Sequence, residues 1–209
     1  MTATEPSIRE LPPGERSAAA RVLALAFADD PVMEFLFPRP QGRTRRLAAF
    51  YRLVIRLLAE HGRVHTDSTL RGVAAWQAPA PPRLDRWRRA RTTLSLLAVL
   101  RSATTRASIL NDVVMTAHPR EAHWYLALLG TGPAHQGQGV GSALLAPVLH
   151  RCDALQLPAY LESSKESNIP FYERHGFQVT CELVIPDGPR VWPMLREPRA
   201  TRRTRSAVG

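Results

Sequence analysis

The sequence predicts a single α/β (α+β) domain in which short strands alternate with amphipathic helices. The chain has 209 residues, of which 44% are hydrophobic, and this is enough to form one substantial core. Its apolar residues recur at helical spacing in some segments and form short extended runs in others. The longest apolar run, at 22–28, is only seven residues long, and the stretch 94–100 is interrupted by Ser95, so we expect no membrane span.

The first third of the chain predicts a strand, two helices and a hairpin. Asp29-Asp30-Pro31 should end the first helix, because the residue before a proline avoids helical angles. Apolar residues between Leu47 and Leu58 recur at steps of three and four residues, which is typical of an amphipathic helix, and Gly62 should stop it. We therefore expect a strand at 7–11, helices at about 13–27 and 47–58, and hairpin strands at 64–66 and 72–76 around a polar turn.

The rest of the chain continues the alternation of helices and strands. Pro147 lies inside one helical pattern, where a proline deletes a hydrogen bond and should kink the helix. The expected elements are two helices within 83–118 with a break near 102–105, a strand at 121–129, a helix at 138–155, a strand at 159–162, a short helix at 169–175, and a terminal hairpin formed by 177–185 and 190–196.

The basic side chains are abundant, but their distribution argues against a nucleic-acid partner. The formal net charge is +10, and of the 28 basic residues only Lys165 is a lysine. Arginines cluster at 83–91 and 199–205, and no aromatic series accompanies the second cluster for stacking on bases. We expect a folded domain over 1–198 and a disordered basic tail over 199–209, because Arg, Thr and Ala there cannot bury enough surface to offset the ordering entropy.

The N-terminus and the cysteines indicate a cytoplasmic protein. Five charged residues within the first twenty exclude the apolar core of a signal peptide. The two cysteines, Cys152 and Cys181, are too few for a disulfide framework and lack metal-ligating partners at suitable spacing. We therefore expect no metal, and the oligomeric state stays open.

A glycine-rich string, Gln136-Gly137-Gln138-Gly139-Val140-Gly141, follows a strand-like run and opens a helical pattern. Glycines let the backbone approach a ligand closely, and the N–H groups at a helix N-terminus attract phosphate. A P-loop is excluded because Gly141 is followed by Ser142 without a lysine, and the glycine spacing does not fit the dinucleotide fingerprint. An anion-binding turn and an ordinary strand-to-helix turn both remain open from this string alone.

The Q-x-x-G-x-G pattern at 136–141 and the segment Asn168-Ile169-Pro170-Phe171-Tyr172-Glu173-Arg174-His175-Gly176-Phe177 together resemble the acyl-CoA signature of GNAT N-acetyltransferases. Residues 119–198 are also similar to puromycin N-acetyltransferase and its actinobacterial relatives, whereas 79–118 show almost no similarity. The resemblance implies a GNAT-like domain with a mixed, mostly antiparallel sheet, flanking helices, and a parallel strand pair, 121–129 and 159–162, that splays apart. It also implies acetyl-CoA as the co-substrate.

The resemblance assigns the cofactor-binding residues to the turn, the preceding strand and the short helix. Backbone N–H groups of the turn would hold the pyrophosphate, and the strand would bond the pantetheine arm. We expect one N–H group of Leu128 or Leu129 to help hold the developing oxyanion. Asn168 should both touch the cofactor and cap the short helix. The predicted cofactor-binding residues are Leu128, Leu129, Gln136, Gly137, Gln138, Gly139, Val140, Gly141, Ser142 and Asn168.

Two catalytic residues follow from the same resemblance. Tyr172 matches the family's general acid, which would protonate the departing thiolate, although its alternative role is a packing aromatic beside Phe171 and Phe177. Glu162 ends the strand that faces the slot and is the candidate base, directly or through water. Its alternative role is an ion pair with a nearby arginine.

For the acceptor, we expect Asp30 and Glu34 to bind a cationic amine and Trp76 to shape the pocket, although an aromatic core residue is an alternative for Trp76. The hypothesis is direct acetyl transfer to a small-molecule primary amine, such as an aminonucleoside or another antibiotic, which would confer antibiotic resistance. A protein amino group as acceptor, and a non-catalytic regulator that senses CoA or associates with nucleic acid, are the alternatives.

Overall fold

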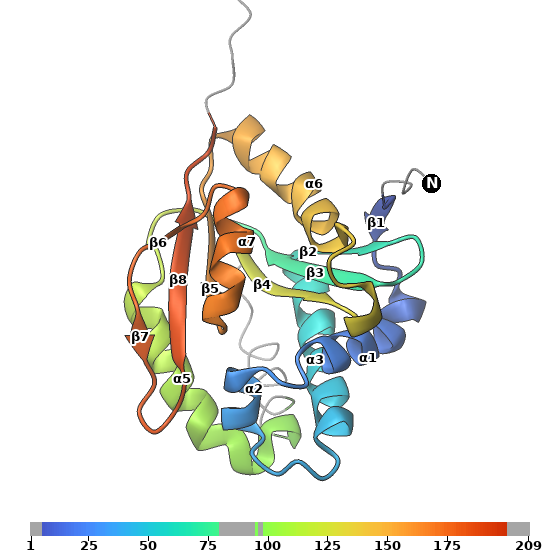
Figure 1. Ribbon diagram of the computed structural model, residues 1–209, viewed down its shortest axis with the longest axis vertical. Coiled ribbons are helices and arrows are strands. Elements are labelled where there is room, and N and C mark those ends of the chain that lie inside the picture. The colour runs from blue at the N-terminus through green and yellow to red at the C-terminus, as the bar shows by residue number, and fades with distance from the viewer. Residues whose placement is uncertain (1–5, 80–94, 96–97, 200–209) are drawn as a thin grey trace, which may run out of the picture.

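The computed structural model describes residues 6–79, 95 and 98–199 (Figure 1). They form an eight-stranded sheet in the order β1-β2-β3-β4-β5-β8-β6, with β7 pairing to β8. Among the described strands, β4 and β5 pair in parallel and every other pairing is antiparallel. The predicted α/β class and the mixed, mostly antiparallel sheet are therefore confirmed.

The strands are β1 Ile8–Glu10, β2 Gly62–Asp67, β3 Gly72–Gln77, β4 Trp124–Thr131, β5 Ala159–Ser163, β6 Gln178–Val179, β7 Leu183–Val184 and β8 Arg190–Arg196. The α-helices are α1 Arg16–Ala26, α2 Pro31–Leu36, α3 Arg43–His61, α5 Thr104–Ala117, α6 Val140–Leu155 and α7 Ile169–Arg174. Short 3-10 helices lie at η1 Pro13–Glu15, η2 Arg101–Ala103, η3 Pro133–His135 and η4 Glu166–Asn168. None of the helices within these described ranges is long and apolar enough to cross a bilayer.

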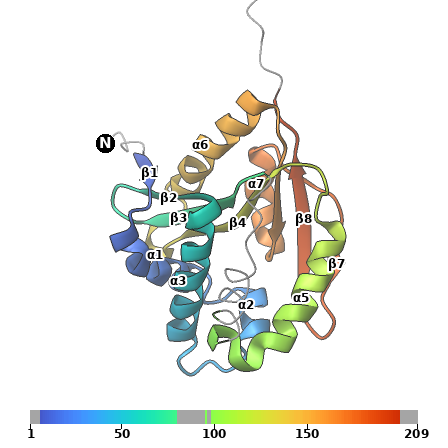
Figure 2. The same cartoon turned by 180° about the vertical axis from the view of Figure 1, so that it is seen from behind.

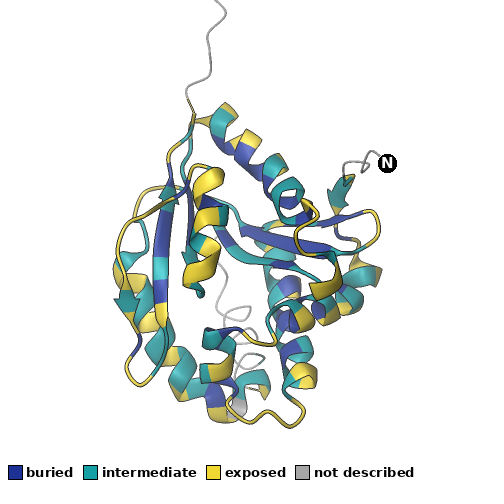
Figure 3. Ribbon diagram, in the orientation of Figure 1, coloured by how far each residue is buried: buried dark blue, intermediate teal, exposed yellow. Residues whose placement is uncertain are grey.

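The two faces of the sheet carry separate hydrophobic clusters, and β3 shows why. Successive side chains of a strand point to opposite faces. Val73 and Ala75 pack with α1 and α3, whereas Ala74 and Trp76 pack with α6 and α7. Figure 1 shows α6 and α7 on the near side of the sheet, and Figure 2 shows α3 and α5 from behind. In Figure 3 the strands are mostly buried while the helices expose their outer sides.

A β-bulge in β4 sets the geometry of the site. Ala75 pairs with Leu128 and Trp76 pairs with Leu126, so Ala127 is an extra residue on β4. The bulge reverses the direction of the following side chains, and Leu126 and Leu128 consequently pack in different clusters.

The parallel pairing of β4 with β5 covers only two residue pairs. Trp124 lies opposite Ala159 and Tyr125 lies opposite Tyr160, and the ladder ends there. Beyond this point β5 continues to pair with β8, while β4 continues to pair with β3. The two strands therefore separate toward their carboxyl ends, as the family resemblance implies.

The hairpin formed by β2 and β3 is held by a buried carboxylate. Asp67 accepts hydrogen bonds from the Thr69 hydroxyl at 2.6 Å and from the Arg71 backbone N–H and guanidinium at 2.5 and 2.8 Å. Burial opposes the charge, but these donors prevail and lower the pKa of Asp67 to about 2. The Arg71 carbonyl in turn accepts from the N–H of Gly132, which lies just after β4. The hairpin thus supports the start of the glycine-rich turn.

Most predicted elements match, with small shifts at their ends. The strand expected at 121–129 begins at Trp124 and continues to Thr131, and the terminal hairpin consists of two short strands, β6 and β7, that both pair with β8. The break predicted near 102–105 matches η2, after which α5 begins. Most of the first helix predicted within 83–118, and the tail beyond Arg199, lie outside the described residues.

Candidate active site

The glycine-rich turn joins β4 to α6 and leaves the start of that helix open. Gly137 and Gly139 have φ values of +72° and +78°, which L side chains rarely adopt. A Cβ atom at either position would meet nothing within 4 Å. Gly139 occupies the N-cap of α6 and no side chain caps the helix there. Free N–H groups, the helix dipole and open space above the glycines together fit a diphosphate.

Side chains next to the glycines brace the loop. The Gln136 side-chain amide donates to the Thr131 carbonyl at 3.3 Å, and that of Gln138 donates to the Ala134 carbonyl at 3.1 Å. Ser142, in the first turn of α6, lies with its hydroxyl 3.0 Å from Nε2 of His175.

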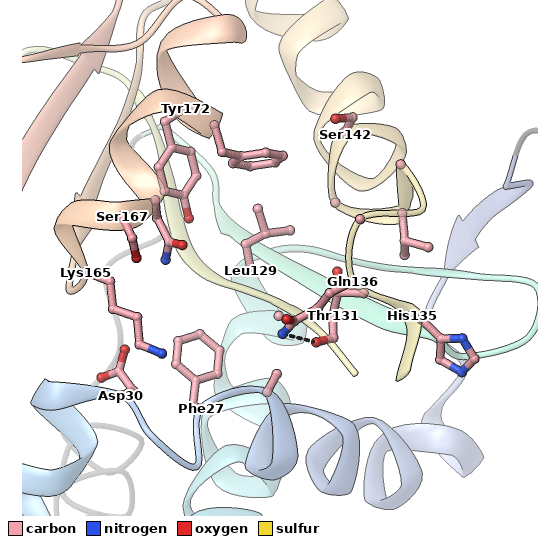
Figure 4. Close-up of a pocket in the computed structure, with 18 of the residues that line it drawn as sticks. Phe27, Asp30, Leu129, Thr131, His135, Gln136, Ser142, Lys165, Ser167 and Tyr172 are labelled. Atoms are coloured by element: carbon pink, nitrogen blue, oxygen red, sulfur yellow. Dashed lines mark hydrogen bonds between the residues drawn. The ribbon is translucent and has the colours of Figure 1, made fainter. Parts of the chain in front are cut away.

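A cleft of about 630 Å³ extends from this turn across the end of β4 (Figure 4). Its lining includes Phe27 and Asp30 from the region between α1 and α2, Leu129 from β4, and Tyr172 from α7. Of the predicted cofactor residues, the cleft brings together Leu129, Gln136, Gly137, Gly139, Val140, Gly141, Ser142 and Asn168. It also contains residues that sequence reasoning missed, among them Thr131, Lys165, Ser167 and Arg174.

A second, much smaller cavity of about 60 Å³ lies in the gap between β4 and β5. Leu128 and Ala127 line it from β4, and Glu162 lines it from β5. Tyr172 and Leu129 line both this cavity and the cleft. The two candidate catalytic residues, Tyr172 and Glu162, therefore share one small space at the inner end of the cleft.

Tyr172 combines packing with access to the cleft. Its ring packs edge-on against Phe171 and Phe177, with ring centroids 5.1 and 6.0 Å apart. In Figure 4 the side chain points from α7 toward the cleft. Burial raises the pKa of Tyr172, and the negative charge of Asp30 adds to the shift. The phenol therefore keeps its proton at neutral pH and can donate it.

Among the described residues, a histidine rather than an arginine lies within 4 Å of the Glu162 carboxylate. Its Oε1 atom lies 3.6 Å from Nδ1 of His118, the residue that follows α5. Sequence reasoning did not single out His118, because 44 positions separate it from Glu162 and no local motif marks it.

Asp30 is nearly fully buried and has two structural roles. One carboxylate oxygen caps α2 by accepting from the N–H groups of Val32 and Met33, and the other accepts from the Ser164 hydroxyl. Burial raises the pKa of Asp30 despite these hydrogen bonds. Next to it, Asp29 forms an ion pair with Lys165 at 2.8 Å. The segment between α1 and α2 is thus tied twice to the loop after β5.

Three other predicted residues lie differently from expectation. Glu34 is half exposed and forms an ion pair with Arg43 at 2.6 Å, outside the lining of both cavities. Trp76 is fully buried in the core beneath α6, which agrees with its alternative role as a packing residue. Asn168 occupies the N-cap of α7 but its side chain makes no capping hydrogen bond, so that part of the prediction is wrong. The side chain instead lines both cavities.

Comparisons with known proteins identify the family of this chain. Residues 63–177 match the family model described as the acetyltransferase (GNAT) family. An uncharacterized N-acetyltransferase of Schizosaccharomyces pombe is 28% identical over 204 residues, covering 86% of this chain and 78% of the relative.

Solved structures show the same fold. A Corynebacterium glutamicum protein, described as histone acetyltransferase HPA2 and related acetyltransferase, has a TM-score of 0.69 at 24% identity and covers 95% of this chain and 99% of its own. The Escherichia coli ribosomal-protein-S18-alanine N-acetyltransferase has a TM-score of 0.51 at 15% identity, covering 95% of this chain and 98% of its own. With the open helix N-terminus and the splayed strands, the family match identifies the chain as an acyltransferase that belongs to the GNAT acetyltransferase family.

Proposed function

We propose that this protein transfers the acetyl group of acetyl-CoA directly to the primary amine of a small molecule. The observation that carries the proposal is the small cavity in which Tyr172 and Glu162 meet, at the inner end of the cleft that starts at the glycine-rich turn. A donor with an anionic end and a reactive end would be oriented by this arrangement. Its charge would rest at the turn and its thioester in the strand gap.

Backbone groups are proposed to bind the donor. The N–H groups of residues 138–141 would hold the diphosphate, and β4 beyond Tyr125 has no β5 partner, so its edge can bond the amide arm. Acetyl-CoA supplies the activated thioester. Either Leu128 or Leu129 would offer an N–H group to the oxyanion, because both residues line the strand gap.

The proton transfers are assigned to two side chains. Glu162 receives a proton from the acceptor ammonium, because its carboxylate lines the cavity and its negative charge also attracts a cation. Tyr172 holds its proton at neutral pH and gives it to the departing thiolate. No covalent enzyme intermediate is needed, since the amine attacks the thioester directly.

A hydrogen bond and an ion pair beside the cleft favour a small acceptor. Asp30 bonds Ser164 and Asp29 pairs with Lys165, so the segment between α1 and α2 is held against the loop after β5. This arrangement supports a narrow approach that suits a slender amine. The resemblance of residues 119–198 to puromycin N-acetyltransferases makes aminonucleosides the first acceptors to test.

The test is to monitor thiol release from acetyl-CoA with aminonucleosides, aminoglycosides, polyamines, amino acids and peptides as acceptors. We expect turnover with at least one small amine, and none with peptides. Turnover with peptides alone would overturn the small-molecule assignment in favour of a protein amino group. A complete lack of turnover, with acetyl-CoA binding measured by calorimetry, would instead favour a sensor.

A further inference from the structure

Two histidines form a chain that leads away from Glu162. Nε2 of His118 lies 3.2 Å from Nε2 of His123, and Nδ1 of His118 lies 3.6 Å from Oε1 of Glu162. Nδ1 of His123 lies 2.7 Å from the Glu121 carbonyl oxygen. The contacts therefore run from a backbone carbonyl, through two imidazole rings, to the candidate base.

The carbonyl at one end determines where the hydrogens lie. A carbonyl oxygen can only accept, so Nδ1 of His123 must carry the hydrogen of the 2.7 Å bond. Burial lowers the pKa of His123, and the neighbouring His118 lowers it further, whereas the Glu121 carbonyl and the charges of Glu162 and Glu121 raise it by smaller amounts. The net lowering favours the neutral form of His123. The Nε2 atom of neutral His123 is then an acceptor. Its contact with His118 consequently requires the hydrogen to come from Nε2 of His118.

In this tautomer Nδ1 of His118 carries no hydrogen and lies 3.6 Å from Oε1 of Glu162. The Oε1 atom of Glu162 is buried and has no hydrogen-bond partner among the described residues. The separation of 3.6 Å is about 0.7 Å longer than an ordinary hydrogen bond, so a small side-chain movement would close it. Two acceptor atoms that face each other are satisfied when one proton is placed between them.

The surroundings of His118 leave few other groups to receive that proton. Tyr125 and Tyr160 lie edge-on to the His118 ring, with centroids 5.1 and 5.0 Å away. Burial raises the pKa of both phenols, and the negative charge of Glu162 raises it further, so both keep their own protons at neutral pH. The side chain of His118 is 19% exposed, which gives it access to water.

We propose that Glu162 and His118 act as one proton-accepting pair, in which Glu162 takes a proton from the acceptor ammonium and passes it to Nδ1 of His118, while His123 holds His118 in the receptive tautomer. This rests on the proposed transfer to an amine. An N–H bond of the ammonium breaks and an O–H bond of Glu162 forms. That O–H bond then breaks as the Nδ1–H bond of His118 forms, and the imidazolium releases its proton to water.

The acceptor nitrogen also loses a second proton during the reaction. After the C–N bond forms and the C–S bond breaks, the thiolate takes the proton of Tyr172. The second proton lost by the acceptor nitrogen replaces it on the phenol. Each turnover therefore yields amide, thiol and one released proton.

The test compares His118→Gln with the parent enzyme across pH 5.5 to 9, using an acceptor amine found in the panel above. We expect kcat at neutral pH to fall about 10-fold to 100-fold, with unchanged acetyl-CoA affinity. The deficit should shrink as pH rises, because the amine then arrives already neutral. His150→Gln, which changes an exposed histidine on α6, is the matched control and should leave the profile unchanged.

A double variant tests whether His118 acts through Glu162. If it does, Glu162→Gln with His118→Gln should be about as slow as Glu162→Gln alone, because effects within one unit are not additive. Additive losses, or a deficit in His118→Gln that is equal at every pH, would overturn the proposal and leave a purely structural role.

The second histidine offers an independent test that leaves His118 intact. His123→Gln retains an oxygen that can accept from Nε2 of His118 and should keep most of the activity, whereas His123→Phe removes the acceptor and should behave like His118→Gln. Parent-like activity in His123→Phe would contradict the inference. If the parent itself shows no turnover, the proposed function fails; if the parent is active and these variants match it, only the histidine pair fails.

Discussion

The donor side and the acceptor side of the cleft are built in different ways. The proposed donor side is centred on one continuous segment, 131–142, in which backbone N–H groups and glycines would bind the diphosphate. The proposed acceptor side draws on four separate places: Asp30 before α2, Glu162 on β5 and Tyr172 on α7 line the cavities, and His118 after α5 lies behind Glu162. A local motif can therefore specify the first side, while the second depends on how the whole sheet brings distant segments together.

The largest loss of activity should follow a change at Tyr172, which lines both the cleft and the small cavity. Tyr172→Phe keeps the ring that packs on Phe171 and Phe177 and removes only the hydroxyl. We expect kcat to fall about 100-fold or more, with acetyl-CoA affinity within about twofold of the parent. Steady-state kinetics and calorimetry measure the two quantities.

Tyr51→Phe is the matched control for that change. The Tyr51 hydroxyl is buried and has no hydrogen-bond partner among the described residues, so its removal should leave both turnover and stability close to the parent. Full activity in Tyr172→Phe would mean that the packing role is the whole role of this residue.

The contribution of Asp67 in the β2–β3 hairpin can be tested by measuring stability as a function of pH. Asp67 has a folded-state pKa of about 2 against an ordinary value of 3.8, so it contributes about 2 kcal/mol of stability at neutral pH. Because the folded pKa is the lower one, this stability is present above pH ~4 and is lost as pH falls toward ~2. Asp67→Asn should lower the free energy of unfolding at neutral pH and flatten its pH dependence in that window, as measured by urea denaturation.

An exposed aspartate provides the comparison for Asp67. Asp187 lies in the turn before β8, and Asn tolerates its positive φ of 54°. Asp187→Asn should therefore leave the free energy of unfolding below pH ~4 unchanged. A parent-like curve for Asp67→Asn would show that the hairpin does not depend on the charge.

A single methyl group at Gly139 can test the glycine-rich turn directly. Gly139→Ala adds a Cβ atom to open space at a φ of +78°, which strains the backbone by about 1–2 kcal/mol and projects into the anion site. We expect the acetyl-CoA dissociation constant to rise about tenfold or more, equivalent to about 1.4 kcal/mol. Gly14→Ala, where a Cβ also meets nothing within 4 Å and φ is not positive, should leave binding unchanged.

The smallest expected effect is on acetyl-CoA affinity, after removal of the Ser142 hydroxyl. Ser142→Ala removes a hydroxyl that lines the cleft and could donate to the diphosphate, and losing one such hydrogen bond to the donor would cost about 0.5–1 kcal/mol, or about twofold to fivefold in acetyl-CoA affinity. Ser68→Ala removes an exposed hydroxyl from the β2–β3 turn and should have no effect. A loss above tenfold at Ser142 would mean that side chains carry more of the donor side than its backbone does.

The sequence predicts the fold well, and it locates the glycine-rich turn before α6, because these signals are local. The helical spacing between Leu47 and Leu58, the polar turn at Asp67, and the glycines before α6 each act within a few residues. The acceptor side is harder, because His118 approaches Glu162 only through the placement of α5 across the sheet. The sequence marks Asp30 by its charge, yet its burial and its bonds to the start of α2 and to Ser164 depend on the folded chain.

The extra residue Ala127 has a wider consequence. Without it, β4 would keep one alternation of side chains along its length, and its ladder with β5 could continue past Tyr125. The protein would then gain backbone hydrogen bonds and lose the opening into which an acyl group could enter. One extra small residue in β4 thus accompanies an opening between β4 and β5, and the sheet forms fewer backbone hydrogen bonds there.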